Sequence, residues 1–386
     1  MERTDILEAA DQYLAANWAD MVDDMARLCS IPSFAEPDQA KPGAPFGPGP
    51  QAALSEALAI AERLGFAVSQ DEGYTGTADL RGQSERQIGM IGHVDVVPAG
   101  VGWHFQPFDL SIKDGCLIGR GVVDDKGPSV LALHAMRCLS GLLARADEPL
   151  AYSIRFIIGT NEETGMADVA HYRRNNADPL FLFTPDAKFP VSYGEKGVFQ
   201  AALRSAPIGK ANILQIEGGM AVNAVPGQAR AVVAAATGQL QSTPHVTVHW
   251  DSSHAVRLEA TGRAAHASTP DEGDSAIAHL VDYLLKNDLV SADERAFLEF
   301  DQKLLGCTDG SQLGIAATDD DFGALTAVGG TIKLEGDCLV QTIDVRFPTT
   351  TTAAELKQAL TERLGPLGGS VETLHTMPVY LVRPDT

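Results

Sequence analysis

The chain has 386 residues, more than one ordinary hydrophobic core organises, so its length predicts two domains or one domain with a large insertion. Apolar residues make up 45% of the sequence and charged residues 21%, and this composition excludes a disordered or fibrous protein. A formal net charge of -22 argues against a partner such as nucleic acid or an anionic membrane, because proteins bind both polyanions through Lys and Arg.

The first residues, MERTDILEAADQYLAANWADM, carry acidic groups throughout and lack the apolar stretch of a signal peptide. No later run approaches the roughly 18 apolar residues of a membrane span, so a cytoplasmic protein is expected. The cysteines are odd in number and form no C-x-x-C pair, which predicts neither a disulfide framework nor a thiolate zinc site. We expect all five to be small buried residues: Cys29, Cys116, Cys138, Cys307 and Cys338.

The chain opens with a pattern typical of a helix that has Thr4 or Asp5 as its cap and ends near Ile31. Its predicted apolar face comprises Leu7, Ala10, Leu14, Trp18, Met21, Met25 and Leu28. Residues 36–50 are rich in Pro and Gly and indicate a loop. A second helix is predicted to follow it through Leu54, Leu58, Ala61 and Leu64.

Short apolar runs at residues 88–91, 152–158 and 180–183 predict strands, and a helix is expected around residues 167–174. Such runs are typical of a largely parallel sheet covered by helices on both faces. The first half of the chain is therefore predicted to be an α/β core.

After Asp186 the pattern changes to alternating strands with occasional helices, which predicts a separate α+β domain. Strands are expected at residues 198–203, 229–234, 245–250 and 331–347, and a helix at residues 275–285.

Four segments at the ends of core strands carry candidate chemistry, and open α/β sheets usually bind their ligands at this edge. In IGHVDVVPAG, His93 follows a strand, and Asp95 could accept a hydrogen bond from its second ring nitrogen and fix the metal-binding tautomer. Alone, a His-x-Asp pair is more often structural or coincidental.

In GRGVVDDKGP, Asp124 is the candidate bridge between two cations, and Asp125 is expected to support the site or to cap a helix that begins near Pro128.

The third segment, IIGTNEETG, places Glu162 and Glu163 directly after a strand. Their side chains diverge, so one can bind a metal while the other accepts a proton from the attacking water; a solvated acidic pair is the alternative. The fourth segment, FLFTPDAKFPV, ends another strand at Asp186, a suitable third ligand for the metal held by His93.

These motifs, in this order, resemble the metallopeptidase family of aminoacylase, carboxypeptidase G, carnosinase and the bacterial dipeptidase peptidase V, with peptidase V the most similar. The match runs through GHVDVVPAG, GRGVVDDKGP, GTNEETG and PDAKFPVSYGEKG. The resemblance implies an α/β fold with a mixed sheet and flanking helices around two zinc ions, with an inserted α+β lid domain. Manganese or cobalt could replace the zinc.

The resemblance also implies the residue roles. One metal would be bound by His93, Asp124 and Asp186, with Asp95 orienting His93, and the Asp124–Asp125 peptide bond is often cis in the family.

The second metal would be shared by Asp124 with Glu163 and a histidine close to the C-terminus, and Glu162 would be the general base. No histidine matches that last ligand, since the chain ends at Thr386, and His375 precedes the segment that would supply it. We therefore expect an incomplete second metal site, exposed apolar surface and reduced stability.

The resemblance divides the chain into a catalytic domain at residues 1–193, a lid at residues 194–371 and the start of a return to the catalytic domain at residues 372–386. Within the lid, His266 in GRAAHAS would stabilise the oxyanion, while Asn223 and Arg346 would hold the substrate. This enlarged type of lid implies a monomer.

The expected function is zinc-dependent hydrolysis of dipeptides. Two alternatives stay open: a deacylase of N-acyl or N-succinyl amino acids, and an inactive binding protein that lacks the last metal ligand. The remaining histidines are expected to be ordinary surface or packing residues: His104, His134, His171, His245, His249, His254 and His279.

Overall fold

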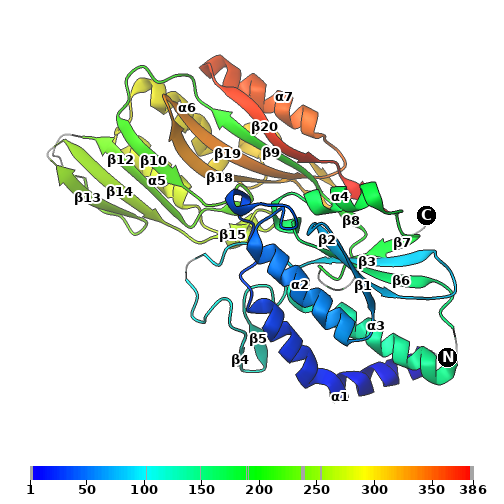
Figure 1. Ribbon diagram of the computed structural model, residues 1–386. Coiled ribbons are helices and arrows are strands. Elements are labelled where there is room, and N and C mark those ends of the chain that lie inside the picture. Colours follow the sequence, from blue (N-terminus) through cyan, green and yellow to red (C-terminus); the bar gives the residue numbers. More distant parts are fainter. Residues whose placement is uncertain are drawn as a thin grey trace. The chain divides into compact units, whose positions relative to one another are not determined.

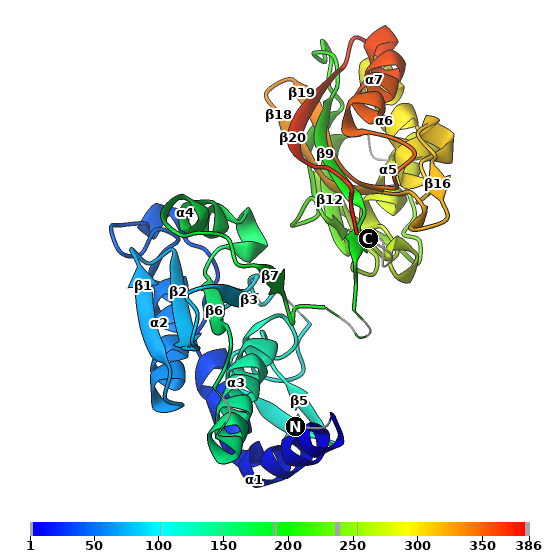
Figure 2. The ribbon, with the colours of Figure 1, turned by 90° about the vertical axis from the view of Figure 1, so that its right-hand side faces the viewer.

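The computed structural model of the chain describes residues 3–100, 102–147, 149–187, 189, 191–235, 240–252 and 254–382. The chain divides into two compact units, Met1–Val191 and Ser192–Thr386, and each has its own sheet and helices (Figures 1 and 2). Within the described residues, no helix combines the length and the apolar character that crossing a membrane requires.

The first unit is built on a five-stranded mixed sheet in the order β1-β2-β6-β3-β7. The strand β3 runs parallel to both β6 and β7, whereas β2 is antiparallel to β6 and β1 is antiparallel to β2. The predicted α/β core is thus confirmed, with a parallel centre and an antiparallel edge. The strands are β1 (Ala67–Asp71), β2 (Thr75–Leu80), β3 (Gln87–His93), β6 (Ser153–Gly159) and β7 (Phe181–Phe183).

Four helices surround this sheet: α1 (Arg3–Cys29), α2 (Pro48–Arg63), α3 (Lys126–Ala146) and α4 (Ala167–Asn175). The helix α2 packs on β1, β2 and β6, and α3 packs on β3 and β6. In contrast, all three side chains of the edge strand β7 are exposed. The prediction that helices cover both faces of the sheet is therefore wrong at β7.

The opening helix differs from its prediction in two ways. It begins at Arg3, so Thr4 and Asp5 lie inside its first turn instead of capping it. The end of its apolar face is buried, but Leu7 and Trp18 are 56% and 51% exposed. The second helix begins at Pro48, inside the loop predicted for residues 36–50. Proline is tolerated in the first turn of a helix because the N–H group that it lacks would have no partner within the helix there.

A buried lysine fixes the start of α3 immediately after the two adjacent aspartates. The ammonium group of Lys126 is fully buried and donates hydrogen bonds to the carbonyl oxygens of Leu28, at 3.1 Å, and Ile31, at 2.7 Å. Because Leu28 lies in the last turn of α1, this contact pairs a positive charge with the negative end of a helix dipole. Burial lowers the pKa of Lys126 to about 8.

The second unit contains an eight-stranded, fully antiparallel sheet in the order β13-β14-β12-β10-β18-β19-β9-β20. Its helices α5 (Ala276–Lys286), α6 (Ala292–Leu305) and α7 (Ala353–Leu364) lie on one side of this sheet, as Figure 2 shows. The strands are β9 (Gly197–Arg204), β10 (Ile213–Gly218), β12 (Gln228–Ala234), β13 (Val246–Ser252), β14 (Ala255–Thr261), β18 (Thr326–Glu335), β19 (Cys338–Phe347) and β20 (Ser370–Met377).

Two sequence predictions need correction, one in the second unit and one for the cysteines along the whole chain. The single strand expected at residues 331–347 is a hairpin, in which β18 and β19 are joined by a turn at Gly336, whose φ of 61° favours glycine. Of the five cysteines expected to be buried, Cys29 and Cys338 are buried, Cys138 and Cys307 are half-buried, and Cys116 is exposed.

The strand β20 pairs with β9, so the domain boundary expected at residue 371 falls inside a strand of the second unit. The last part of the expected return segment, residues 383–386, lies outside the described residues. The assignment of the two units as catalytic domain and inserted lid stays a prediction.

Candidate metal centre

Three neighbouring parallel strands bring the predicted ligands to one edge of the first sheet. His93 is the last residue of β3 and pairs with Gly159, the last residue of β6. Asp186 follows three residues after the end of β7, on the other side of β3. Because the carboxyl ends of parallel strands share one edge, residues far apart in the chain meet there.

The imidazole of His93 lies at the centre of this group. Its Nε2 atom is 3.0 Å from Asp124 Oδ1, 3.5 Å from Asp186 Oδ2 and 3.9 Å from Glu162 Oε2. The side chain of His93 is only 3% exposed, whereas that of Asp124 is 61% exposed. The described residues His93, Asp124 and Asp186 offer three donor atoms within 4.8 Å of one another.

Asp95 supports two parts of the site at once. The Nδ1 atom of His93 lies 3.0 Å from the backbone carbonyl oxygen of Asp95 and 3.3 Å from its Oδ1 atom. The buried carboxylate also accepts hydrogen bonds from the backbone N–H groups of Glu162 and Glu163, each at 3.1 Å. A donor on Nδ1 leaves the Nε2 lone pair facing the acids, which is the tautomer that a metal requires. No sequence pattern indicated the bonds to the two glutamate amides.

Asp125 holds the backbone of His93 in place. Its Oδ2 atom accepts hydrogen bonds from the backbone N–H of His93, at 3.0 Å, and from Ser129 Oγ, at 3.1 Å. Asp125 is the N-cap residue of α3, but its side chain does not cap the helix, because it is used to bind His93. The predicted capping role is therefore wrong, while the expected cis peptide between Asp124 and Asp125 is present.

The turn that carries the two glutamates is anchored by a further buried acid. Asp168, which is 1% exposed, accepts hydrogen bonds from the backbone N–H groups of Thr160, at 2.6 Å, and Asn161, at 2.9 Å. These bonds satisfy donors that β6 leaves unpaired as it ends. Asp168 is the second residue of α4, so its role in holding this turn is seen only in the structure and not in the sequence.

The two glutamates have different surroundings. Glu162 Oε2 faces His93, whereas Glu163 Oε1 accepts a hydrogen bond from the backbone N–H of Val97 at 3.3 Å. Burial raises the pKa of Glu162. Burial and the adjacent charge of Asp124 raise the pKa of Glu163 to about 7.

The electrostatics of this group fit a bound cation. Burial alone would lower the pKa of His93, but its bonds to Asp124, Asp186 and Asp95 outweigh burial and hold the pKa well above its usual range. The group thus binds positive charge strongly, as a proton on the imidazole or as a metal in its place. One imidazole with several carboxylates is a donor set that zinc and similar divalent ions accept.

The predicted lid residues Asn223 and His266 lie next to each other in the second unit. The short strands β11 (Ala224–Val225) and β15 (Ala265–His266) form an antiparallel pair in which Ala224 is opposite His266. The backbone N–H of Ala267 donates to the carbonyl oxygen of Asn223 at 3.0 Å. The Nδ1 atom of His266 is 2.7 Å from Ser268 Oγ.

Arg346 belongs to the same end of the second unit. It pairs across the sheet with Thr326, and the hydroxyl of Thr326 donates to the carbonyl oxygen of Ala267 at 3.1 Å. The guanidinium group of Arg346 donates to both carboxylate oxygens of Asp344, at 2.7 Å and 3.2 Å. A predicted anion-binding arginine is therefore held in position by a buried acid.

Comparisons with known proteins show the family of this chain. The sequence model of the family described as Peptidase family M20/M25/M40 matches residues 89–374. A relative named putative dipeptidase YtjP, from Bacillus subtilis (strain 168), is 32% identical over 348 residues, which cover 86% of this chain and 74% of the relative. The Beta-Ala-Xaa dipeptidase of Lactobacillus delbrueckii subsp. lactis is 30% identical over 325 residues, which cover 79% of this chain and 66% of the relative.

Solved structures share the fold at low sequence identity. The crystal structure of human carnosine dipeptidase 1 matches with a TM-score of 0.54 and 15% identity, covering 98% of this chain and 82% of that one. The di-peptidase Dug1p from Saccharomyces cerevisiae matches with a TM-score of 0.56 and 12% identity, with the same coverage of 98% and 82%. The resemblance predicted from the four motifs is confirmed: the chain belongs to the peptidase family M20/M25/M40.

Proposed function

We propose that this protein is a metal-dependent dipeptidase that cleaves the peptide bond of dipeptides with an activated water molecule. The observation that carries the proposal is the meeting of His93, Asp124 and Asp186 at the ends of adjacent parallel strands, with Glu162 beside them. The dipeptidase names of the relatives support the choice of substrate class.

The donor set favours zinc as the metal, with manganese or cobalt as replacements. His93 Nε2, Asp124 and Asp186 would hold one ion, and Asp124 with Glu163 would hold the second. The chemistry supplied by bound ions is polarisation of the scissile carbonyl group and a lower pKa for the attacking water.

Glu162 is the proposed general base. Its carboxylate lies beside the ligand group, while Asp95 holds its backbone N–H and so fixes where the side chain starts. It would take a proton from the attacking water and return it to the leaving amine. The raised pKa caused by burial makes Glu162 a stronger base than an exposed glutamate.

Three residues of the second unit are proposed to bind the substrate. His266 would donate a hydrogen bond to the oxyanion, and Asn223 and Arg346 would hold the oxyanion or the substrate carboxylate. Arg346 suits a carboxylate because its guanidinium group carries five N–H donors, of which two bind Asp344. This assignment makes the first unit catalytic and the second unit its lid, and the proposal includes the monomeric state and cytoplasmic location expected from the sequence.

The proposal is tested by removing metal with a chelator and assaying the protein before and after addition of zinc, manganese or cobalt. The substrate panel contains α-linked dipeptides, β-alanyl dipeptides, N-acetyl amino acids and N-succinyl amino acids. We expect dipeptide hydrolysis to be lost with the metal and restored by it. Hydrolysis of only the N-acyl compounds would identify a deacylase instead, and a reloaded protein that hydrolyses nothing would refute the enzyme.

A further inference from the structure

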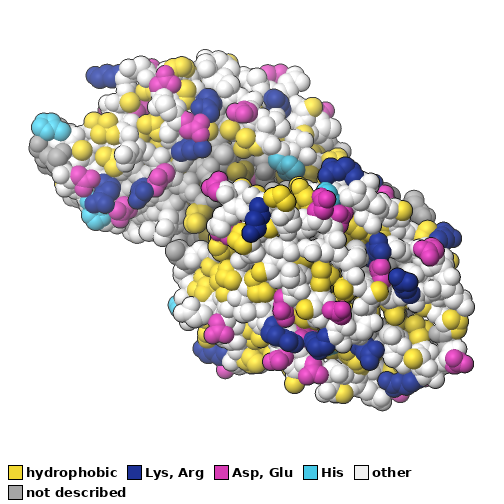
Figure 3. All heavy atoms as spheres, viewed as in Figure 1, with side chains coloured by type: hydrophobic (Ala, Val, Ile, Leu, Met, Phe, Trp, Pro, Cys, Tyr) yellow, Lys and Arg dark blue, Asp and Glu magenta, His cyan; other side chains and the backbone are white. Residues whose placement is uncertain are grey.

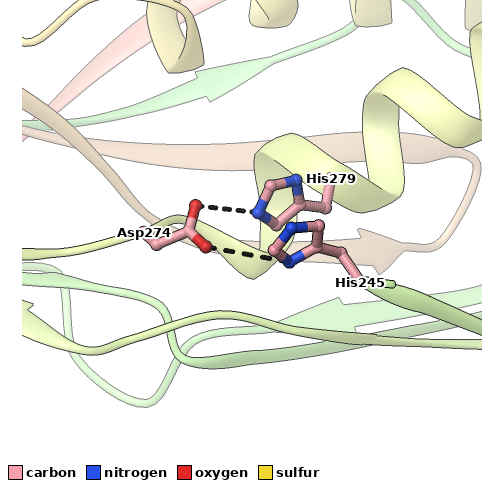
Figure 4. Close-up of side chains that lie close together, drawn as sticks. All are labelled: His245, Asp274 and His279. Carbon is pink, nitrogen blue, oxygen red and sulfur yellow. Dashed lines mark hydrogen bonds and ion pairs between the residues drawn. The ribbon is translucent and has the colours of Figure 1, made fainter. Parts of the chain in front are cut away.

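A second group of metal-binding side chains lies entirely within the second unit, separate from the centre described above. It comprises His245, Asp274 and His279, whose donor atoms all lie within 4.8 Å of one another. His279 Nε2 is 2.7 Å from Asp274 Oδ1, and His245 Nδ1 is 3.8 Å from Asp274 Oδ2. Figure 4 shows both rings directing a nitrogen at the same carboxylate.

Backbone hydrogen bonds hold each of these three residues in its segment of the second unit. The N–H of Thr261 donates to the carbonyl oxygen of His245 at 2.9 Å, and Asp274 exchanges two backbone hydrogen bonds with Arg263, each at 2.8 Å. His279 lies in the first turn of α5, where its N–H donates to the carbonyl oxygen of Ser275, the residue that caps this helix. The three donors are therefore positioned before any ligand arrives.

The imidazole rings of the two histidines lie face to face beside the carboxylate of Asp274. The rings of His245 and His279 are stacked, with centroids 3.9 Å apart and an interplanar angle of 15°. The two rings approach different oxygens of Asp274, so two imidazoles and one carboxylate lie together.

The separations also suit a small divalent ion. Ligands at about 2.0–2.1 Å from a tetrahedral zinc lie roughly 3.3 Å from one another. The separations of 2.7 Å and 3.8 Å from Asp274 to the two histidines bracket this value. Because an imidazole binds a metal in its ring plane, the more exposed ring of His245 would turn out of its stack with His279 to reach the same ion. The side chain of His279 is 27% exposed and that of His245 is 48% exposed, which leaves room for water as a fourth ligand.

We propose that His245, Asp274 and His279 form a second, non-catalytic binding site for a zinc-type transition-metal ion. Two imidazoles and one carboxylate favour zinc, nickel or copper over magnesium and calcium, which prefer oxygen ligands. Bound metal would join the residue before β13, the edge strand of the eight-stranded sheet, to the first turn of α5. A tie between these elements stabilises the folded second unit, because the unfolded chain lacks the preformed site.

The test counts metal ions on the full chain. Protein freed of metal is dialysed against micromolar zinc, and bound zinc per chain is measured for the wild type, His245→Gln and His279→Gln. His249→Gln is the matched control, because His249 lies on β13 but outside the group. We expect the wild type and His249→Gln to bind one more zinc ion per chain than His245→Gln or His279→Gln. We also expect zinc to raise the melting temperature of the wild type and His249→Gln by more than that of the other two variants.

The readout does not depend on peptide hydrolysis, so it stands apart from the proposed function. Melting curves of the metal-free proteins check folding, and His245→Gln serves as the milder variant because His245 is the more exposed ligand. Equal zinc counts in the wild type and both variants would overturn the proposal.

Discussion

Glu162 and Glu163 are adjacent in the chain, yet their side chains face different partners. Glu162 points toward His93, while Glu163 accepts a hydrogen bond from the backbone of Val97 and feels the charge of Asp124. The carboxylate of Asp95 receives both of their backbone N–H groups and so sets the turn that separates them. One residue can thus transfer protons while its neighbour binds metal.

This separation predicts different failures for the two glutamine variants. Glu162→Gln removes the proposed base without removing a metal ligand, so kcat should fall by about a thousandfold with the metal content unchanged. Glu163→Gln should instead lower the metal content. Turnover and bound metal are measured together, with the exposed Glu85→Gln as control. Near wild-type kcat in Glu162→Gln would contradict the assigned role.

At the scale of single elements, the end of β3 depends on a residue without a side chain. A Cβ atom on Gly92 would lie 2.5 Å from Asp125 Oδ2, which holds the backbone N–H of His93, and 2.7 Å from Ser129 Oγ, which donates to that same oxygen. Both neighbours are buried and bonded, so neither can move without loss. The contact between β3 and α3 that positions His93 therefore requires glycine here.

Two glycine-to-alanine substitutions test this requirement. Gly92→Ala should lower both the stability and the metal affinity, because it displaces Asp125. Gly141→Ala is the matched control: Gly141 lies inside α3 with nothing within 4 Å of its Cβ position, so alanine should stabilise the helix by roughly 0.5–1 kcal/mol. Thermal melts and zinc binding measure both effects. Equal behaviour of the two variants would contradict the proposed contact.

A buried acid in the helix α6 makes the stability of the protein depend on pH. Asp301 is fully buried, neither of its carboxylate oxygens has a hydrogen-bond partner among the described residues, and burial raises its pKa to about 8. The folded protein therefore keeps a proton that the unfolded chain releases from about pH 4 upward. The contribution of Asp301 to stability falls as the pH rises toward 8 and is constant above it, with a slope of at most about 1.4 kcal/mol per pH unit.

Replacement of Asp301 by Asn removes this titration and should flatten the pH dependence. The free energy of unfolding is measured by urea denaturation. Between pH 5 and pH 8, that of the wild type should fall relative to that of Asp301→Asn. Any cost of burying the amide is constant with pH and cancels in this comparison. The exposed Asp320→Asn is the control. A wild-type to variant difference that is the same at pH 5 and pH 8 would refute the prediction.

At the scale of the whole molecule, the sequence predicted most of what local patterns encode. Apolar runs identified β3, β6 and β7, and the polar residues after them gave the candidate ligands His93 and Asp186, which the fold brings together. The contacts that hold these ligands were not predictable, because they join distant segments: Asp95 reaches the amide of Glu162, 67 residues away.

The buried side chain of Lys126 illustrates the same limit. Its ammonium group binds carbonyl groups at the end of α1, up to 98 residues away in sequence, and nothing in the local pattern distinguishes it from an exposed lysine. The pairing of His245 with Asp274 and His279 was likewise missed, since these histidines were expected to be ordinary surface residues. Periodicity predicts elements, but it does not predict which polar groups meet.

Charged side chains of both signs are intermixed on the surface of the protein that Figure 3 shows. On the face in Figure 3, Lys and Arg side chains are scattered among acidic ones instead of forming one basic patch. The net charge of -22 attracts divalent cations over long range, which favours loading of acidic metal centres.

The most direct test of the central claim is anomalous diffraction at the zinc absorption edge from crystals of the protein grown with zinc. The account predicts a peak about 2.0–2.2 Å from His93 Nε2 and from carboxylate oxygens of Asp124 and Asp186, with any second ion between Asp124 and Glu163. Crystals in which no zinc lies beside His93, Asp124 and Asp186, whether or not zinc is bound elsewhere, would contradict it.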